Sequence, residues 1–158
     1  MEKFYDDNGL KFKCTNCKAC CTLDGGAVIL SSSDLSQLAK YVDLTEEQFI
    51  KVYCRWLENS DGKQYLCLKD KNKSQCVFWD CEHGCQVYEG RPVQCRTYPF
   101  WTKILETRNS WEKEKSFCPG INCGETHSKS EIESELSKYE ENKTKRIIRQ
   151  SENYASFS

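Results

Sequence analysis

The stretch Cys14-Thr15-Asn16-Cys17-Lys18-Ala19-Cys20-Cys21 carries four thiols in the order C-x-x-C-x-x-C-C. A C-x-x-C step lets two thiolates reach one metal ion, and two such steps in a row place three sulfurs around a single centre. The first three ligands of the bacterial ferredoxin run C-x-x-C-x-x-C-x-x-x-C-P have this spacing. Here Cys21 follows at once. Because adjacent side chains diverge, we expect it to serve a second centre or to approach the first from another direction. The stretch is interpreted as a metal site around which the fold is organised.

The composition indicates that hydrophobic burial alone does not hold this fold together. The chain has 158 residues, of which 12 are cysteines and 30% are charged. Its mean hydropathy is −0.75. A chain of this length suits one domain with a modest core, so we expect a single domain over 1–158 with its cysteine-bearing core over 12–124. The formal net charge of −1 gives no electrostatic case for nucleic-acid binding.

The N-terminal residues have no apolar core of a signal peptide, and no apolar run reaches the roughly 20 residues of a membrane span. We therefore expect a cytoplasmic protein without a membrane partner. In that reducing compartment, clustered cysteines are more often metal ligands than disulfides. The alternative is a disulfide-stapled secreted domain whose signal has been removed.

Capping motifs predict two helices in the first half of the chain. The motifs S-x-x-D at 31–34 and T-x-x-Q at 45–48 predict helices over about 32–42 and 46–58. Apolar residues at helical spacing support the second helix: Phe49, Val52, Tyr53, Trp56 and Leu57. A charged amphipathic pattern predicts a long C-terminal helix over about 129–149.

Strands and a short helical turn are expected between these helices. The apolar run 27–30 suits a buried strand, and 63–68 with 76–79 suits a hairpin. A further strand is expected over 101–108, and a short helical turn over 92–97. Together these elements predict a small α+β fold organised around cysteine-ligated metal.

A second cysteine-bearing stretch runs from residue 76 to residue 100. Pro92 suits the first position of the expected helical turn, on which Cys95 and Arg96 would lie. A helix N-terminus and a guanidinium both stabilise a nearby thiolate, as an anionic metal–sulfur centre requires. Arg96 is therefore a candidate cofactor-binding residue.

The two stretches form one longer motif: Cys14-x-x-Cys17-x-x-Cys20-Cys21, Cys76-Val77-Phe78, Cys85-Gln86-Val87-Tyr88-Glu89-x-Arg91-Pro92-x-x-Cys95-Arg96-x-Tyr98-Pro99-Phe100 and Cys118-Pro119-Gly120. Over about 12–124 it resembles the CxxCxxCC cysteine-cluster family, described as zinc- or iron-chelating domains. The resemblance implies eight cysteines as metal ligands: Cys14, Cys17, Cys20, Cys21, Cys76, Cys85, Cys95 and Cys118. The remaining four are additions particular to this sequence: Cys54, Cys67, Cys81 and Cys123.

The pattern favours iron–sulfur over zinc. The candidate ligands are thiols, the spacing matches a cubane-binding loop, and eight family cysteines would serve two [4Fe-4S] clusters. Zinc stays open as the alternative, because C-x-x-C is also its commonest structural unit. The resemblance implies an oxidoreductase or electron-transfer role with an unidentified partner, or a zinc module without catalysis. Flagellin lysine methylases contain a similar domain in a larger chain, so protein-lysine methylation is a weaker alternative.

Other motifs narrow the chemistry. The radical S-adenosylmethionine spacing C-x-x-x-C-x-x-C is absent, because Tyr88 takes its third place, and neither G-x-G-x-x-G nor a P-loop is present. His83 is a possible zinc ligand but more often such a residue is exposed, and His127 is expected to be solvated. Aromatic residues are expected to pack around the centre: Tyr88, Tyr98, Phe100 and Trp101. No base–nucleophile group stands out, so no catalytic residue is assigned.

Overall fold

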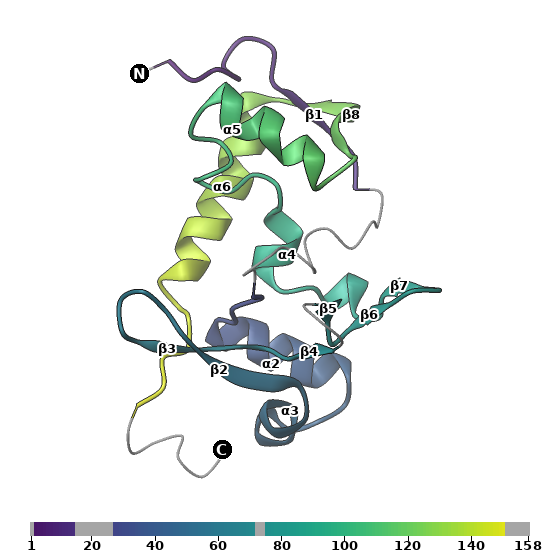
Figure 1. The fold of residues 1–158 in the computed structure, drawn as a ribbon, viewed down its shortest axis with the longest axis vertical. Coiled ribbons are helices and arrows are strands. Elements are labelled where there is room, and N and C mark those ends of the chain that lie inside the picture. The colour runs from purple at the N-terminus through teal and green to yellow at the C-terminus, as the bar shows by residue number, and fades with distance from the viewer. Residues whose placement is uncertain (1, 15–26, 72–74, 151–158) are drawn as a thin grey trace.

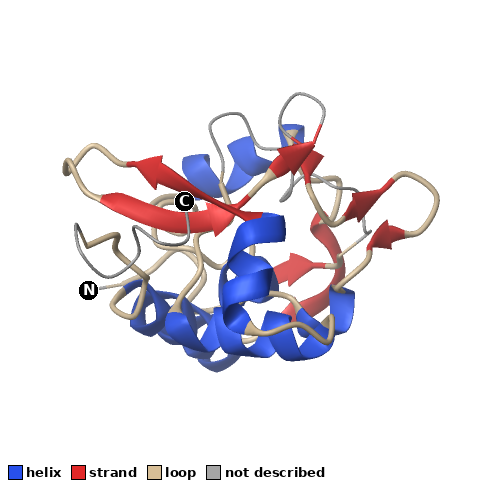
Figure 2. Ribbon diagram, turned by 90° about the horizontal axis from the view of Figure 1, so that it is seen from below, coloured by secondary structure: helices blue, strands red, loops and turns tan. Residues whose placement is uncertain are grey.

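The computed structural model describes residues 2–14, 27–71 and 75–150. Within them the chain forms five α-helices and pairs of short antiparallel strands (Figure 1). Figure 2, a view at right angles, shows the strands dispersed around the molecule rather than joined in one sheet. The expected α+β fold class is confirmed.

The helices are, in chain order, α2 (Ser32–Tyr41), α3 (Glu46–Tyr53), α4 (Val93–Thr97), α5 (Arg108–Lys113) and α6 (Lys129–Lys143). Two 3₁₀ turns accompany them, η1 (Tyr88–Gly90) and η2 (Glu114–Ser116). The strand pairs are β1 (Leu10–Phe12) with β8 (Ile121–His127), β2 (Cys54–Glu58) with β3 (Gln64–Leu68), β4 (Asp70–Lys71) with β5 (Gln75–Cys76), and β6 (Trp79–Asp80) with β7 (Gly84–Cys85).

The capping motifs fix the helix starts as predicted. At α2 the Ser31 hydroxyl accepts a hydrogen bond from the Asp34 amide at 3.1 Å, and at α3 the Thr45 hydroxyl accepts one from Gln48 at 3.1 Å. The predicted turn over 92–97 is also present, as α4. Side-chain caps act within one turn, so local sequence suffices to place these starts.

The prediction of a helix over 46–58 is wrong in its second half. Helix α3 ends at Tyr53, because Cys54 takes an extended conformation (φ −117°, ψ 156°) and begins β2. Trp56 then lies opposite Leu66 of β3. Val52, expected on the buried stripe, is 52% exposed. Trp56 and Leu57, which the helical pattern had assigned to one helix face, instead lie in a strand paired with β3.

Three other boundaries differ from the sequence predictions. Strand β3 pairs with β2, while the residues expected to complete a hairpin at 76–79 divide between β5 and β6. Residues 101–108 form turns and the first residue of α5 instead of a strand. Helix α6 ends at Lys143, and the chain beyond it turns to pair with the N-terminal half: the Ile147 amide donates to the Leu30 carbonyl at 3.1 Å.

The expected strand over 27–30 is buried and extended alongside β3, although its pairing is limited to one isolated bridge, Ile29 to Cys67. The Leu30 amide donates to the Leu66 carbonyl at 2.9 Å, and the Leu68 amide donates to the Val28 carbonyl at 3.0 Å. This run therefore forms one wall of the core, as its apolar sequence indicated.

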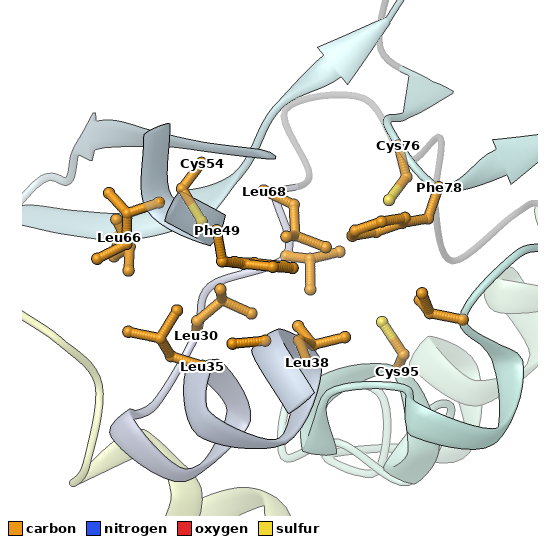
Figure 3. Close-up of a cluster of buried hydrophobic side chains, with 14 of the residues drawn as sticks. Leu30, Leu35, Leu38, Phe49, Cys54, Leu66, Leu68, Cys76, Phe78 and Cys95 are labelled. Carbon is orange, nitrogen blue, oxygen red and sulfur yellow. The ribbon is translucent and has the colours of Figure 1, made fainter. Parts of the chain in front are cut away.

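Two hydrophobic clusters form the interior. The larger cluster joins α2, α3, β2 and β3 to the cysteine-bearing segments, and includes Leu30, Leu38, Phe49, Leu66, Phe78, Cys76 and Cys95 (Figure 3). The aromatic cluster lies under α5 and β8 and includes Tyr5, Tyr98, Phe100, Trp111, Cys118, Ile121 and Ile132. Figure 1 shows α4 between these two halves, with α6 running beside both.

A buried carboxylate joins three of the helices. Asp34 is 2% exposed. Its Oδ2 accepts hydrogen bonds from the Ser31 amide at 3.0 Å and from Asn142 Nδ2 at 3.1 Å, and its Oδ1 accepts one from the Val93 amide at 3.0 Å. Asp34 thereby connects the first turn of α2 to the start of α4 and the end of α6.

Replacing this carboxylate should destabilise the fold. Asp34→Ala leaves three buried donors without an acceptor, so we expect the free energy of unfolding to fall by about 3 kcal/mol. Asn142→Ala removes a single hydrogen bond and should cost about 1 kcal/mol. Urea denaturation of both variants, with exposed Asp7→Ala as control, measures the difference. A stability of Asp34→Ala within about 0.5 kcal/mol of wild type would refute this role.

Candidate metal centre

Three predicted metal ligands pack against the larger cluster. Cys76 at the end of β5 and Cys95 in α4 are buried, and Cys85 at the end of β7 is half-buried. In Figure 3 the sulfur atoms of Cys76 and Cys95 point toward each other from opposite sides of the interior. Thiols from three separate segments therefore reach one region of the core.

Helix α4 positions Cys95 between the two clusters. The hydrogen bond from the Val93 amide to Asp34 Oδ1 fixes its start. The Thr97 hydroxyl donates a second hydrogen bond back to the Val93 carbonyl at 2.8 Å. Cys95 faces the larger cluster, whereas Tyr98, directly after the helix, belongs to the aromatic cluster. This single helical turn therefore connects the expected metal-binding region to both halves of the core.

Cys118 lies in the aromatic cluster and is 3% exposed. The loop that follows it approaches the N-terminal arm closely: the Lys13 amide donates to the Gly120 carbonyl at 3.2 Å. A Cβ at position 120 would collide with the Lys13 carbonyl oxygen, so only glycine permits this approach. The residue before Cys14 is thereby held beside the Cys118 loop.

Cys17, Cys20 and Cys21 lie outside the described residues, in the segment 15–26. Both residues that flank this segment are tied to the second cysteine stretch. Cys14 shares a side-chain hydrogen bond with Tyr88, and the Ala27 carbonyl accepts one from Gln94 Nε2 at 2.8 Å. Cys14 and Ala27, the described residues on either side of this segment, therefore each contact the stretch that carries Cys85 and Cys95.

Gln94 is a site residue that the sequence analysis missed. Its side-chain amide forms two bonds to one strand, because Nε2 donates to Ala27 and Oε1 accepts from the Ile29 amide at 3.1 Å. It directly precedes Cys95, so the helical turn that carries this thiol also contacts the first described residues after the cysteine-rich segment. Nothing in the local sequence distinguishes this glutamine from a solvated one.

The Tyr88 side chain contacts both the Cys14 thiol and the Arg91 guanidinium. Burial raises the pKa of the Tyr88 hydroxyl and the Cys14 thiol raises it further, while the positive charge of Arg91 opposes both effects. The Arg91 guanidinium stacks on the Tyr88 ring, with its Cζ 3.8 Å from the ring centroid. Tyr88 is thus placed beside Cys14, at 36% exposure, and does not belong to either core cluster.

The other three aromatic residues expected around the centre pack together in the aromatic cluster. Trp101 stacks edge-on against Tyr98 at 5.1 Å between centroids, and Phe100 stacks on Trp111 at 5.9 Å. They share this cluster with Cys118. Tyr98, Phe100 and Trp101 thus surround buried Cys118, whereas Tyr88 leaves Cys14 exposed, and packing of these residues around a metal stays a prediction.

Arg96 leaves α4 in a different direction from Cys95. Its side chain is exposed and borders two hollows between α4 and α6, and its Nε donates to the Arg91 carbonyl at 2.9 Å. Successive helix residues point about 100° apart, which explains why one side chain enters the core and the next lies at the surface. Binding of a cofactor by Arg96 stays a prediction.

The two histidines occupy different environments. His83 is exposed in the β6–β7 turn, 3.6 Å from an oxygen of Asp80. His127 is half-buried rather than solvated as expected: its Nε2 lies 3.1 Å from the Phe12 carbonyl oxygen and its ring packs against Phe100. In the part of the chain that the structure describes, no three Cys, His, Asp or Glu side chains form a metal-binding group.

The cysteines outside the family motif fall into two kinds. Cys54 and Cys67 are buried in the β2–β3 pair, and burial raises their thiol pKa to about 12 and about 11, respectively. Cys81 and Cys123 are exposed. Because the thiolate is the form that binds metal or attacks an electrophile, Cys54 and Cys67 are poorly suited to either role at neutral pH.

These features define a class: a small α+β protein with short antiparallel strand pairs, whose cysteine motif is spread over separate segments of the chain. The chain belongs to the CxxCxxCC family, whose model, described as "Putative zinc- or iron-chelating domain", matches residues 13–119. That match covers more than half of the chain and both cysteine stretches. No solved structure matches the chain. None of the helices in the described ranges is both long and apolar enough to cross a lipid bilayer.

The raised pKa values predict the order of thiol alkylation. At about pH 8, N-ethylmaleimide should modify exposed Cys81 and Cys123 first, because Cys54 and Cys67 are almost fully protonated and inaccessible. Mass spectrometry of peptides after timed quenching measures each site. Denaturant should make Cys54 and Cys67 react, which serves as the internal control. Modification of either one at the rate of Cys81 in the folded protein would contradict the assignment.

Proposed function

We propose that this protein binds one or two [4Fe-4S] clusters through the eight family cysteines and acts in electron transfer with a redox partner. Family membership supports cysteine-ligated metal binding. The observation that carries the proposal is the clamping of both flanks of the CxxCxxCC segment, at Cys14 and Ala27, to the segment bearing Cys85 and Cys95. Contacts on both sides of the cysteines at 17–21 support a centre shared by the two cysteine stretches.

The chemistry of the family cysteines supports an iron–sulfur cluster. Cys76 and Cys95 belong to the larger cluster and Cys85 packs against it, so these three thiols have hydrophobic surroundings. Thiolates are the ligands that iron–sulfur clusters take, and a dry apolar shell tunes their reduction potential. When bound, such a cluster would supply one-electron chemistry, while the chain's own residues hold the thiols and exclude water.

Zinc is the second candidate, because the family description names zinc and iron alike. Cys₄ zinc sites use the same C-x-x-C steps and stabilise small folds without redox chemistry. The protein would then be a structural or metal-handling module. A reducing, cytoplasmic compartment is part of both proposals, since either metal needs reduced thiols.

Metal and acid-labile sulfide analysis of protein purified without oxygen separates the two candidates. We expect iron with a matching amount of sulfide, and broad visible absorption that bleaches on reduction. Zinc without sulfide and without visible absorption would replace the iron–sulfur proposal with the zinc module. Protein that is folded and contains neither metal would refute metal binding.

Ligand substitution tests the assignment of the cysteines. The double variant Cys17→Ser/Cys95→Ser should lose the metal or fail to fold, because it removes a donor from each cysteine stretch. Cys123→Ser is the matched control, since that thiol is exposed and outside the family motif. Metal content per folded protein is the readout. A folded and fully metallated double variant would refute the ligand assignment.

The Gln94 clamp should control metal retention. Gln94→Ala removes both side-chain bonds to the strand that follows the CxxCxxCC segment, so we expect metal to be lost to a chelator severalfold faster. Gln37→Ala, at an exposed position of α2, is the control. The rate of metal loss is followed by absorbance or by a chelator dye. Equal rates in both variants would show that the clamp has no part in holding the centre.

A further inference from the structure

A polar groove of about 430 Å³ lies between α4 and α6. Four cationic and two acidic side chains line it: Arg91, Arg96, Lys138, Lys145, Glu135 and Glu141. Its volume lies in the range of clefts that bind small molecules, about 300–1,000 Å³. The excess of cations contrasts with the formal net charge of −1 for the whole chain. This local charge distribution favours a negatively charged ligand.

The two arginines are oriented by hydrogen bonds to backbone carbonyls. Arg96 Nε donates to the Arg91 carbonyl at 2.9 Å, and Arg91 Nε donates to the Tyr88 carbonyl at 2.9 Å. The Arg91 guanidinium is also stacked on the Tyr88 ring. Each side chain uses its Nε in these bonds, and among the described residues its terminal nitrogens have no hydrogen-bond acceptor. A guanidinium held in this way binds an oxyanion with less loss of side-chain entropy.

Neither arginine has a carboxylate within ion-pair distance among the residues that the structure describes. The six ion pairs there involve other groups. Asp34 lies beneath the groove, at Val93 and Asn142, but its oxygens already accept three hydrogen bonds from neutral donors. Within the described ranges, therefore, no carboxylate directly neutralises the charge on these two guanidinium groups.

On the α6 side of the groove, each of the two lysines forms an ion pair with a glutamate of α6. Lys138 contacts Glu135 at 2.8 Å, and Lys145 contacts Glu141 at 3.3 Å. Such solvent-exposed ion pairs contribute little to stability. An anion in the groove can therefore attract both ammonium groups toward itself at small cost. The groove thus offers fixed arginines on one wall and adjustable lysines on the other.

We propose that this groove binds a small oxyanion ligand, carrying a phosphate or carboxylate group, between Arg91 and Arg96 on one side and Lys138 and Lys145 on the other. Bidentate contacts from guanidinium nitrogens match the spacing of phosphate and carboxylate oxygens. Because Arg96 directly follows Cys95, the ligand would lie next to the turn that presents a proposed metal ligand. The proposal itself does not depend on which metal the cysteines hold.

Titration calorimetry with inorganic phosphate, pyrophosphate and citrate tests the proposal and separates phosphate from carboxylate sources. The metal-loaded protein as purified is used, and its metal content is measured for every variant. We expect binding of at least one probe that weakens as salt rises, because the contacts are electrostatic. The variant Arg91→Gln/Arg96→Gln should weaken binding by about tenfold or more. Lys138→Gln/Lys145→Gln should weaken it by a smaller factor.

The control is Lys11→Gln/Lys103→Gln, which removes the same net charge from exposed positions outside the groove. It should bind within about twofold of wild type. The lysine variant alters only the α6 side and leaves the backbone contacts of α4 intact, so it stays informative if the arginine variant loses metal. Failure of all three probes to bind at millimolar concentration, or unchanged affinity in both groove variants, would overturn the proposal while leaving metal binding unaffected.

Discussion

The buried carboxylate of Asp34 is the contact on which the arrangement of the helices depends. A charged group at 2% exposure is tolerated only when its oxygens are hydrogen-bonded. Here they accept from α2, from the first residue of α4 and from Asn142 near the end of α6. Since α4 has only five residues, it cannot hold its own orientation, and Asp34 supplies the missing constraint. The direction in which Cys95 enters the core follows from that constraint.

The same helical turn also contacts residues that flank the cysteine-rich segment. Gln94 ties α4 to Ala27 and Ile29, and the Lys13–Gly120 bond ties the other flank to the Cys118 loop. Both flanks are thus held by contacts that need no metal. Such contacts reduce the conformational freedom of the flanking residues, which matters in a chain with a mean hydropathy of −0.75 and two small apolar clusters.

The sequence predicted what depends on neighbouring residues and missed what depends on distant ones. The reciprocal bonds of Ser31 with Asp34 were readable because they lie within one turn, but the bonds of Asp34 to Val93 and Asn142 join residues 59 and 108 positions away. The helix predicted over 46–58 failed for a related reason. Trp56 and Leu57 satisfy a helical stripe, yet pairing with β3, a tertiary contact, decides their conformation.

The candidate site follows the same division between local and distant information. Cysteine spacing predicts the type of ligand, because C-x-x-C geometry is local, but it cannot group thiols from separate segments. The fold supplies part of that grouping. The larger cluster contains Cys76 and Cys95, with Cys85 packed against it, whereas Cys118 lies in the aromatic cluster. The loop after Cys118 is hydrogen-bonded to Lys13, the residue before Cys14. Cys14 itself contacts Tyr88, so the start of the CxxCxxCC segment is near both sets of thiols. The described residues at the start of this segment, Lys13 and Cys14, thus contact the Cys118 loop and Tyr88, while the two sets of thiols lie in separate hydrophobic clusters.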